Sequence, residues 1–242
     1  MEKSRVPFGL KAGRLYGVDE VARGAECDCV CPKCLAPLWA KKGEINAYHF
    51  SHAPGIIPCA NGTETAIHQM AKQILLEVCE LQVPEIVLRD SLTNIGGGIH
   101  RDTEVVVPES RLRLDSVVLE KVVDDLRPDV WGDVNGRYYL VEIIVSNPID
   151  DEKRKKLRDQ GHICLVIDLS KCRNEITKAE LSSLIIDVVE NKKWISYPDV
   201  LQAQRKLHDR LVESVRLANN GIKQQRDVHA RRRSAKWRDG QA

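Results

Sequence analysis

The sequence predicts an α/β or α+β fold with a mixed β-sheet flanked by helices. Three observations predict it: a run of short strands that resembles a meander, a helix at about 149–160, and the continuous apolar strand HICLVIDLS at 162–170. An uninterrupted apolar strand is typical of a parallel strand buried on both faces. A meander, a crossover helix and a parallel strand together indicate layers of helix and sheet around one core.

Composition narrows the class of protein without deciding it. The chain has 242 residues, of which 30% are charged and 43% hydrophobic, and its formal net charge is +2. These values are ordinary for one or two globular domains. No apolar run approaches the length of a membrane span, and residues 1–25 lack the pattern of a signal peptide. We therefore expect a cytoplasmic protein without a membrane partner.

The amino-terminal segment is predicted to bind zinc. Five of the eight cysteines fall within residues 27–59, and a chain of this length does not need a disulfide scaffold. The knuckle Cys31-Pro-Lys-Cys34 has the spacing with which two thiolates bind zinc. A closed structural site is expected from four of five candidates: Cys31, Cys34, His49, His52 and Cys59.

The conformation of the segment AYHFSH decides the second pair of ligands, after a hairpin turn expected at residues 42–43. If the segment continues as a strand, His49 and His52 point to opposite faces, so one of them binds and Cys59 completes the set. If the chain turns at Phe50, both histidines bind. The sequence leaves both alternatives open.

The other cysteines have simpler interpretations. Cys27 and Cys29 are spare thiols that could replace one zinc ligand. The remaining three lie in apolar or isolated settings and are expected to be core thiols: Cys79, Cys164 and Cys172. Residues 27–59 contain few large apolar side chains, so the segment needs a metal or a supporting neighbour to fold.

The stretch GTETAIHQMAKQILLEVCEL predicts a helix at about 62–81, with Thr63 as its cap. Apolar residues repeat at helical spacing and form the expected buried stripe: Ile67, Met70, Ala71, Ile74 and Val78. Beside that stripe, Glu64, His68 and Lys72 fall at i, i+4 and i+8 and face one way. They form either an ordinary polar margin or an edge that faces an acidic site. In the second case Glu64 or His68 would complete the acidic site and Lys72 would meet a phosphate.

Residues 127–147 predict a β-hairpin that carries two carboxylates. The pair Asn135-Gly136 is a strong turn signal because both residues tolerate positive φ. Asp129 and Glu142 would then lie on adjacent strands. A charged side chain inside YYLVEIIV is costly to bury alone, and two converging carboxylates are a cradle for Mg²⁺ or Mn²⁺. The alternative is an edge-strand glutamate that faces water.

The remaining elements alternate along the chain. Strands are expected at 103–107, 111–119, 127–134 and 137–146, and a second helix is expected from Thr177 to about residue 191. Its start carries a capping box, Thr-Lys-Ala-Glu. The three glycines at 96–98 are interpreted as a flexible loop.

Beyond Pro198 the composition changes. Residues 199–238 predict one long helix or two, with an apolar seam formed by Leu201, Leu207, Leu211, Val215 and Ala218. From Lys223 onward, seven basic residues stand against two acidic ones. Such a segment is attracted to phosphate backbones, and Trp237 could stack on an exposed base. The alternatives are a frayed terminus and a homodimer formed through the seam.

Taken in order, CPKC…KKG…HFSH…C…ETAIHQMAK, RPDV…YLVEIIVSNPIDDEKRKKL, IDLS and KKWISYP resemble the competence protein CoiA-like family. The resemblance covers roughly residues 20–198. It implies a zinc-binding region at 1–62, a restriction-endonuclease-like domain of the PD-(D/E)XK type at 63–197, and a basic helical extension at 198–242.

The resemblance also implies a metal-dependent DNA nuclease. Asp129 and Glu142 would be the carboxylates of the signature, and Glu64 the helix acid seen in many such nucleases. With the backbone carbonyl of Ile143, the two carboxylates would hold Mg²⁺ or Mn²⁺. The expected partner is DNA, single- or double-stranded, with RNA as the alternative.

One position departs from the signature, which asks for lysine two residues after the glutamate and has Ile144 here. Isoleucine can neither donate a proton nor orient water. Lys153, just beyond the strand, is the first candidate for a migrated lysine, and Lys72 is the second. Ser146 lies on the same strand face as Glu142 and could hold a water. The rival hypothesis is a catalytically inactive module that binds DNA or supports assembly.

Overall fold

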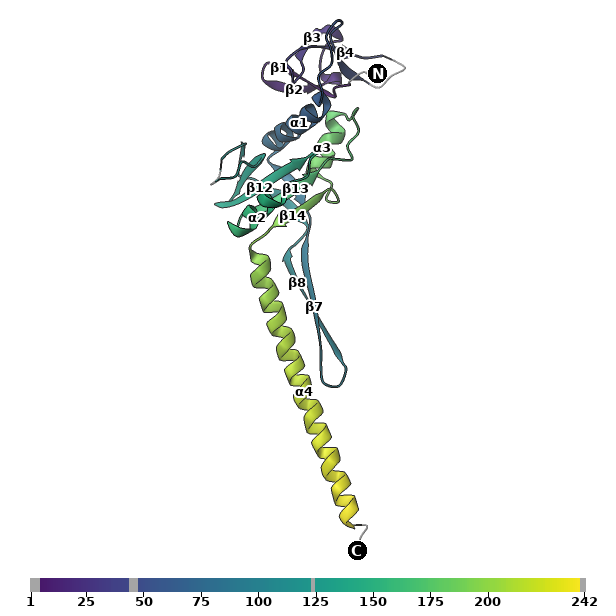
Figure 1. The fold of residues 1–242 in the computed structure, drawn as a ribbon, viewed down its shortest axis with the longest axis vertical. Helices are drawn as coiled ribbons and strands as arrows, with labels where there is room; N and C mark the ends of the chain where they lie inside the picture. Colours follow the sequence, from purple (N-terminus) through teal and green to yellow (C-terminus); the bar gives the residue numbers. More distant parts are fainter. Residues whose placement is uncertain (1–4, 44–47, 123–124, 240–242) are drawn as a thin grey trace. The chain divides into compact units, whose positions relative to one another are not determined.

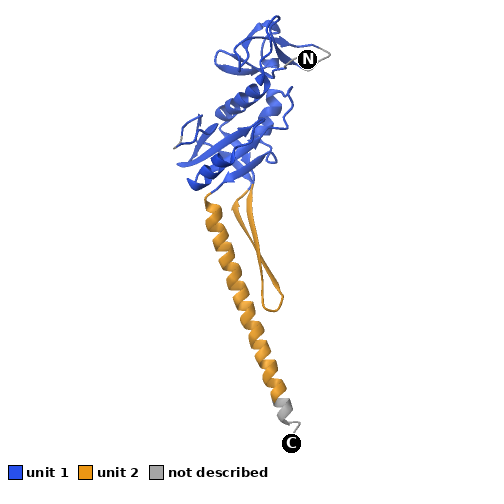
Figure 2. Ribbon diagram, in the orientation of Figure 1, with its two compact units in different colours: residues 1–84, 109–197 blue, residues 85–108, 198–242 orange. Residues whose placement is uncertain are grey.

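The computed structural model describes the backbone of residues 5–43, 48–122 and 125–239, and the side chains over the same ranges as far as residue 234. Its Cα atoms separate into two compact units, shown in Figure 2. Unit 1 comprises residues 1–84 and 109–197, and unit 2 comprises residues 85–108 and 198–242. None of the helices in the described part of the chain combines the length and apolar character needed to cross a membrane.

Unit 1 begins with a five-stranded antiparallel sheet in the order β2-β1-β3-β4-β5. Its strands, labelled in part in Figure 1, are β1 (Phe8–Lys11), β2 (Arg14–Gly17), β3 (Gly24–Val30), β4 (Pro37–Lys41) and β5 (His49–His52), with a 3₁₀ turn, η1 (Val18–Glu20), after β2. AYHFSH thus contains a strand. The turn expected at 42–43 follows β4, and residues 44–47 lie outside the described ranges.

Helix α1 (Gly62–Val78) follows this sheet. The stripe predicted for it is buried at Ile67, Met70, Ala71 and Ile74. Val78 is 42% exposed because the helix ends there, at a left-handed Cys79. The predicted cap was wrong: Asn61 is the N-cap residue, and the Thr63 hydroxyl donates to the carbonyl of Arg5 at 2.6 Å.

The central sheet of unit 1 has the order β10-β11-β12-β13-β14. Its strands are β10 (Ser116–Leu119), β11 (Val130–Val134), β12 (Arg137–Ile144), β13 (Ile163–Asp168) and β14 (Lys192–Ser196). The β12–β13 pair is parallel and the other pairs are antiparallel. This mixed sheet within an α+β architecture confirms the fold class expected from the meander and the apolar strand.

The turn Asn135-Gly136 joins β11 to β12, and both residues have positive φ, 51° and 79°. Side chains alternate between the two faces of the sheet. Val141 and Ile143 belong to the same core as α1 and α3 (Lys178–Ile186), whereas Leu140 packs with Leu157 of α2 (Asp151–Asp159) in a second, smaller core. The sheet is therefore covered on both faces, as Figure 1 shows in outline.

Two ends of helices differ from expectation. Chain 80–83 forms a strand, β6 (Glu80–Val83), paired with β9 (Ser110–Arg113), where the helix was expected to continue. The second helix has the expected capping box, in which Thr177 and Glu180 exchange hydrogen bonds, but it ends at Ile186. Strand β14 follows at residue 192 and was not expected from the sequence.

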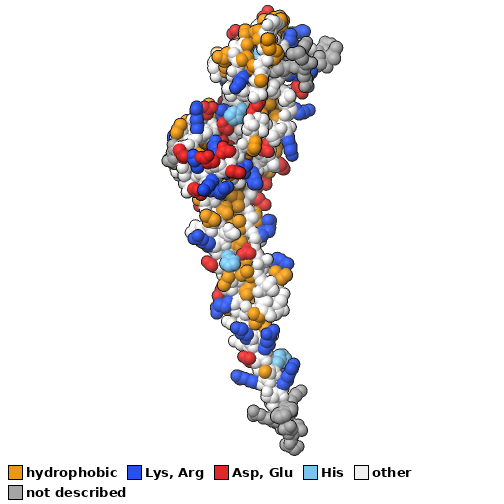
Figure 3. Space-filling model, in the orientation of Figure 1, with side chains coloured by type: hydrophobic (Ala, Val, Ile, Leu, Met, Phe, Trp, Pro, Cys, Tyr) orange, Lys and Arg blue, Asp and Glu red, His pale blue; other side chains and the backbone are white. Residues whose placement is uncertain are grey.

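Unit 2 contains the hairpin β7 (Ile86–Thr93) and β8 (Ile99–Val107), and the single helix α4 (Asp199–Asp239). The glycines at 96–98 are the turn of this hairpin. In the helix seam, Leu207 and Leu211 are buried, whereas Leu201 is 67% exposed. Figure 3 shows Lys and Arg side chains along the carboxy-terminal part of α4. The side chain of Trp237 lies outside the described residues.

Candidate active site and candidate metal centre

The hairpin β11–β12 places the two predicted carboxylates beside each other. Val130 pairs with Val141, so the next step of the same register sets Asp129 opposite Glu142. Glu142 is 5% exposed, and the side chain of Asp129 is 17% exposed. Two adjacent carboxylates with so little access to water need positive charge or hydrogen-bond donors nearby.

Asp129 receives donors on both carboxylate oxygens. Its Oδ2 accepts from the amide of Ile143 at 2.9 Å. Its Oδ1 lies 3.1 Å from Nε2 of His68 and 3.7 Å from Nζ of Lys72. Burial by itself would raise the pKa of Asp129, but the contacts with His68, the Ile143 amide and Lys72 hold the pKa below its usual value. Asp129 is therefore ionised at neutral pH.

Glu142 is paired with Lys153, whose Nζ lies 2.7 Å from Oε1 of the carboxylate. The start of α2 positions this lysine, because the N-cap Asp150 accepts the backbone N–H of Lys153 at 2.7 Å. Burial raises the pKa of Glu142 above its usual value even though Lys153 acts in the opposite direction. The ionised form of Glu142 is thus incompletely compensated, and a further cation at this point would be stabilised.

Ile144, at the position where the signature has lysine, is the last residue of β12 and is half-buried. The ammonium group next to Glu142 arrives from α2 instead. Of the two candidates for a migrated lysine, Lys153 contacts Glu142, and Nζ of Lys72 lies 3.7 Å from Oδ1 of Asp129. The structure therefore brings both lysines to the carboxylates, Lys72 from α1 and Lys153 from α2.

Lys72 is buried and has a second carboxylate partner that the sequence did not reveal. Its Nζ donates to Oε1 of Glu120 at 2.7 Å, and Glu120 also pairs with Arg127. The hydrogen bond and the charge of Lys72 lower the pKa of Glu120. Glu120 lies just after β10 with a φ of 52°. No periodic pattern marks such a loop residue, so only the folded chain identifies it.

Glu64 stands at the other end of the polar edge of α1. Its Oε1 accepts a hydrogen bond from the hydroxyl of Ser146, which lies just beyond β12. The two side chains line a cavity of about 280 Å³ together with Ser170. The polar side chains of α1 therefore lie along the carboxylate pair: His68 contacts Asp129, and Glu64 contacts Ser146 just after the end of β12.

A second cluster lies in the amino-terminal region. The ligand atoms of Cys31, Cys34, His52 and Cys59 all lie within 4.8 Å of one another. Cys31 and Cys59 have their Sγ atoms 3.7 Å apart, and Nε2 of His52 is 3.3 Å from Sγ of Cys34 and 3.8 Å from Sγ of Cys59. Zinc with bonds of about 2.3 Å to sulfur and about 2.0 Å to nitrogen has tetrahedral edges of roughly 3.5–3.8 Å. The cluster is compatible with a structural zinc site.

Local structure explains this set of four. Cys31 begins a turn in which the amide of Leu35 donates to the Cys31 carbonyl at 2.9 Å. Strand β5 carries His52 to the buried face, while His49, three residues earlier, lies outside the cluster. The helix α1 begins directly against the thiols, because a Cβ at Gly62 would lie 3.1 Å from Sγ of Cys59.

The spare thiols point elsewhere. Cys27 donates to the carbonyl of Leu38 at 3.2 Å, and Cys29 donates to the carbonyl of Cys27 at 3.3 Å. Within the cluster, burial and the adjacent thiols raise the pKa of Cys59 to about 12. Bound zinc would reverse this preference, because it takes thiols as thiolates.

Comparison of the chain with models of known families, with curated proteins and with solved structures finds no match.

Proposed function

We propose that the protein is a metal-dependent nuclease of the PD-(D/E)XK type, with its active site on the central sheet, where Asp129, just before β11, lies opposite Glu142 of the neighbouring strand β12. The observation that carries the proposal is the 2.7 Å contact between Nζ of Lys153 and Oε1 of Glu142. It supplies the ammonium group that Ile144 cannot provide.

Asp129, Glu142 and the carbonyl oxygen of Ile143 would hold Mg²⁺ or Mn²⁺, which prefer oxygen ligands. A divalent ion bound there would activate water and stabilise the leaving oxygen of a phosphodiester. The nearly buried Glu142, whose pKa is raised by burial, supports this assignment because its charge is stabilised by an added cation.

The other side chains of the site would position the attacking water and the carboxylates. Lys153 would hold the attacking water next to Glu142 and stabilise the charge that develops on the phosphate. His68 and the amide of Ile143 fix the orientation of Asp129 through its two oxygens. Lys72, buried between Asp129 and Glu120, keeps the carboxylates ionised. Glu64 is the additional acid on α1, held by Ser146.

The Cys31–Cys34–His52–Cys59 cluster would hold zinc in a structural capacity, because four protein ligands leave no open position for a substrate. The substrate we propose is DNA in single- or double-stranded form, with RNA as the alternative. Basic residues on the outer part of α4 would add attraction for phosphate. A homodimer through α4 stays a prediction, and two leucines of the seam, Leu207 and Leu211, are already buried in the single chain.

A second function is a nuclease-fold module that binds nucleic acid or supports assembly without cleaving. One observation favours it: Asp129 and Glu142 each already contact a basic side chain, His68 and Lys153 respectively. A charge network of this kind also occurs as a purely structural device.

A cleavage assay separates the two. Single-stranded, double-stranded and branched DNA are incubated with Mg²⁺ or Mn²⁺ and either the wild-type protein or Glu142→Ala. Cleavage by the wild type alone supports the nuclease. Binding without cleavage on every substrate supports the module, and equal cleavage by Glu142→Ala removes Glu142 from the mechanism.

A further inference from the structure

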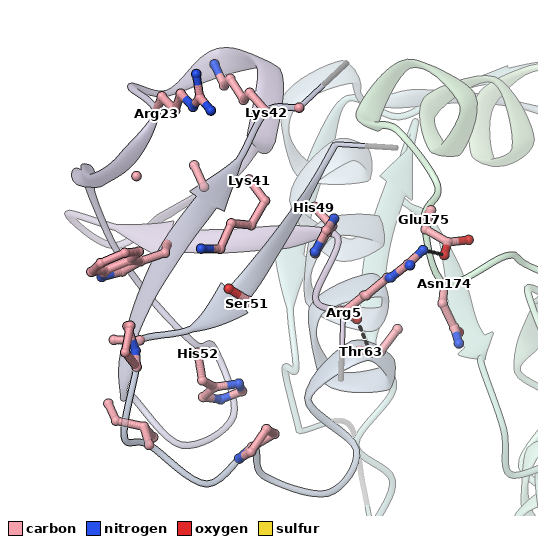
Figure 4. A pocket seen from close by; sticks show the side chains of 18 of the residues that line it. Arg5, Arg23, Lys41, Lys42, His49, Ser51, His52, Thr63, Asn174 and Glu175 are labelled. Atoms are coloured by element: carbon pink, nitrogen blue, oxygen red, sulfur yellow. Dashed lines mark hydrogen bonds and ion pairs between the residues drawn. The ribbon is translucent and has the colours of Figure 1, made fainter. Parts of the chain in front are cut away.

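The outer face of the β4–β5 pair carries a basic groove that the proposed active site does not use. A cavity of about 1410 Å³ opens on this side of unit 1. We define the basic groove by six of its lining residues: Arg23, Trp39, Lys41, Lys42, His49 and Ser51. Figure 4 shows Lys41, His49 and Ser51 on neighbouring strands, with Arg5, Thr63, Asn174 and Glu175 along another side.

Strand register explains why these side chains share a face. Lys41 pairs with His49, and Trp39 pairs with Ser51, so the four form a block across two strands. The residues that alternate with them are buried: Leu38, Ala40, Phe50 and His52. Trp39, Lys41, His49 and Ser51 therefore share one face of the strand pair, and the cavity also reaches Ala40 and His52 of the alternating set.

The groove has an excess of positive charge. It is lined by Arg5, Arg23, Lys41 and Lys42, and among the described lining residues Glu175 is the one carboxylate. Glu175 pairs with Arg5. Lys42 donates to backbone carbonyls, including that of Asp19 at 3.3 Å, and among the described residues its side chain has no ion-pair partner. A concave surface with this balance attracts anions, and repeated cations favour a ligand with several negative charges.

An aromatic side chain lies among these cations. Trp39 is half-buried, and Nζ of Lys41 lies 4.8 Å from the centroid of its ring. This contact places the ammonium group of Lys41 over the electron-rich ring of Trp39, and a base that stacks on the same ring face would take the place of that contact. An aromatic platform next to cations is the combination with which proteins bind single strands, because an unpaired base stacks on the ring while phosphates meet the cations. In a duplex the base faces are already stacked.

We propose that the basic groove binds a single strand of nucleic acid, with one base stacked on Trp39 and adjacent phosphates on Lys41 and Arg23. The groove would hold the single-stranded substrate of the proposed nuclease, and this role as a substrate site rests on the proposed function. The binding itself does not depend on cleavage, so the two are tested apart.

The test is the equilibrium binding of a fluorescently labelled oligothymidylate, followed by anisotropy over a range of salt concentrations. The full chain carries Glu142→Gln in every sample, so that cleavage does not consume the probe. Lys41→Ala is compared with Lys33→Ala, a matched loss of charge on the exposed knuckle outside the groove. We expect weaker binding for Lys41→Ala only, and a decrease of about 0.7 in the slope of log K against log salt for the lost phosphate contact.

Trp39 is tested in the same way. Trp39→Ala should weaken binding by about 5- to 150-fold, the range expected for one stacked base, whereas Trp39→Tyr should retain most of the affinity. Zinc content and thermal unfolding identify any variant that fails to fold. If Trp39→Ala fails to fold, the affinities of Trp39→Tyr and Lys41→Ala test the proposal. A matching duplex should bind more weakly than the single strand, and an oligouridylate tests whether the sugar matters.

The inference is overturned if folded Lys41→Ala and Trp39→Ala proteins bind the oligothymidylate as tightly as their parent. It is also overturned if the duplex binds as well as the single strand and the groove variants affect both equally. Should the wild type cleave nothing while both groove variants lose affinity, the groove proposal stands and the nuclease proposal fails. The opposite pattern, cleavage that depends on Glu142 with binding indifferent to the groove, refutes the groove alone.

Discussion

The ammonium group of Lys153, in helix α2, lies 2.7 Å from Oε1 of Glu142, in strand β12. The strand position that would carry lysine in the PD-(D/E)XK signature holds Ile144. Lys153 reaches the same carboxylate from α2. It supplies the positive charge and the hydrogen-bond donor that a lysine at position 144 would supply, but from a different place in the chain.

Lys153→Met should reduce cleavage by about 10²- to 10⁴-fold, the contribution typical of a positioned proton donor or acceptor. Lys155→Met, an exposed lysine two residues further along the same helix, is the matched control and should cleave normally. The measurement is kcat on the best substrate, with DNA affinity determined separately. Equal losses in both variants would assign the effect to the overall charge of α2.

The cleavage rate should have an acid limb above pH 4.5, the usual pKa of a glutamic acid side chain. Burial raises the pKa of Glu142, and metal binding needs the ionised carboxylate, so activity should fall as the pH decreases through this raised value. A profile of log kcat/KM against pH reports the free enzyme. A limb at or below the usual pKa would mean that another group controls it.

The same raised pKa affects stability. Because the folded protein holds the proton of Glu142 more tightly than the unfolded chain does, this residue costs stability as the pH rises from about its unfolded pKa of 4.5 to the folded value, and the cost is constant above that. Urea unfolding of wild type and Glu142→Gln at several pH values measures it. The wild type should lose stability relative to the variant across this interval.

Asp129 should show the opposite dependence. Its pKa is lowered in the folded protein, so its contribution is fully present above the unfolded value of about 3.8 and is lost as the pH falls through the folded value. Asp129→Asn should therefore be less stable than wild type at neutral pH, with the difference shrinking under acid. A constant difference at all pH values would show that the contacts of Asp129 do not depend on its charge.

Zinc content should distinguish the two histidines. His52→Ala and Cys34→Ser should lower the amount of zinc bound per chain and make residues 27–59 more sensitive to protease, because each removes a member of the cluster. His49→Ala should retain full zinc, since β5 directs it to the groove face. Elemental analysis measures the zinc. Normal zinc in Cys34→Ser would exclude Cys34 as a ligand.

Arg210 should hold the hairpin of unit 2 to α4. It contacts Asp102 and Glu104 at 2.8 Å each, and Asp102 stands directly opposite Asp90 across the two strands. Like charges in that position destabilise a strand pair, and Arg210 offsets them. Arg210→Ala should make the hairpin more sensitive to limited proteolysis. Arg216→Ala, which removes an ion pair within α4, should leave the rate of proteolysis of the hairpin unchanged.

Local signals in the sequence were sufficient for several features. The Asn135-Gly136 turn, the capping box at Thr177 and most of the buried stripe of α1 depend on residues within a few positions of one another, and the structure confirms them. The knuckle Cys31-Pro-Lys-Cys34 is local in the same sense. The sequence left open the choice between His49 and His52, because it depended on whether the segment AYHFSH formed a strand.

Other features required the folded chain. Residues 85–108 were expected in part as a loop, yet they form a hairpin that belongs with α4, more than ninety residues later in the chain (see also Figure 2). Glu120 meets Lys72 across 48 positions. Strand β14, too, has little pattern of its own.

The sequence by itself therefore determined the class of fold, the hairpin with its two carboxylates, and the cysteine and histidine candidates. Only the tertiary structure decided which lysine meets Glu142, which histidine joins the thiols, and which side chains line the basic groove. The physical reason is that periodicity and turn chemistry act over a few residues, whereas these contacts depend on strand register and helix packing between segments far apart in the chain.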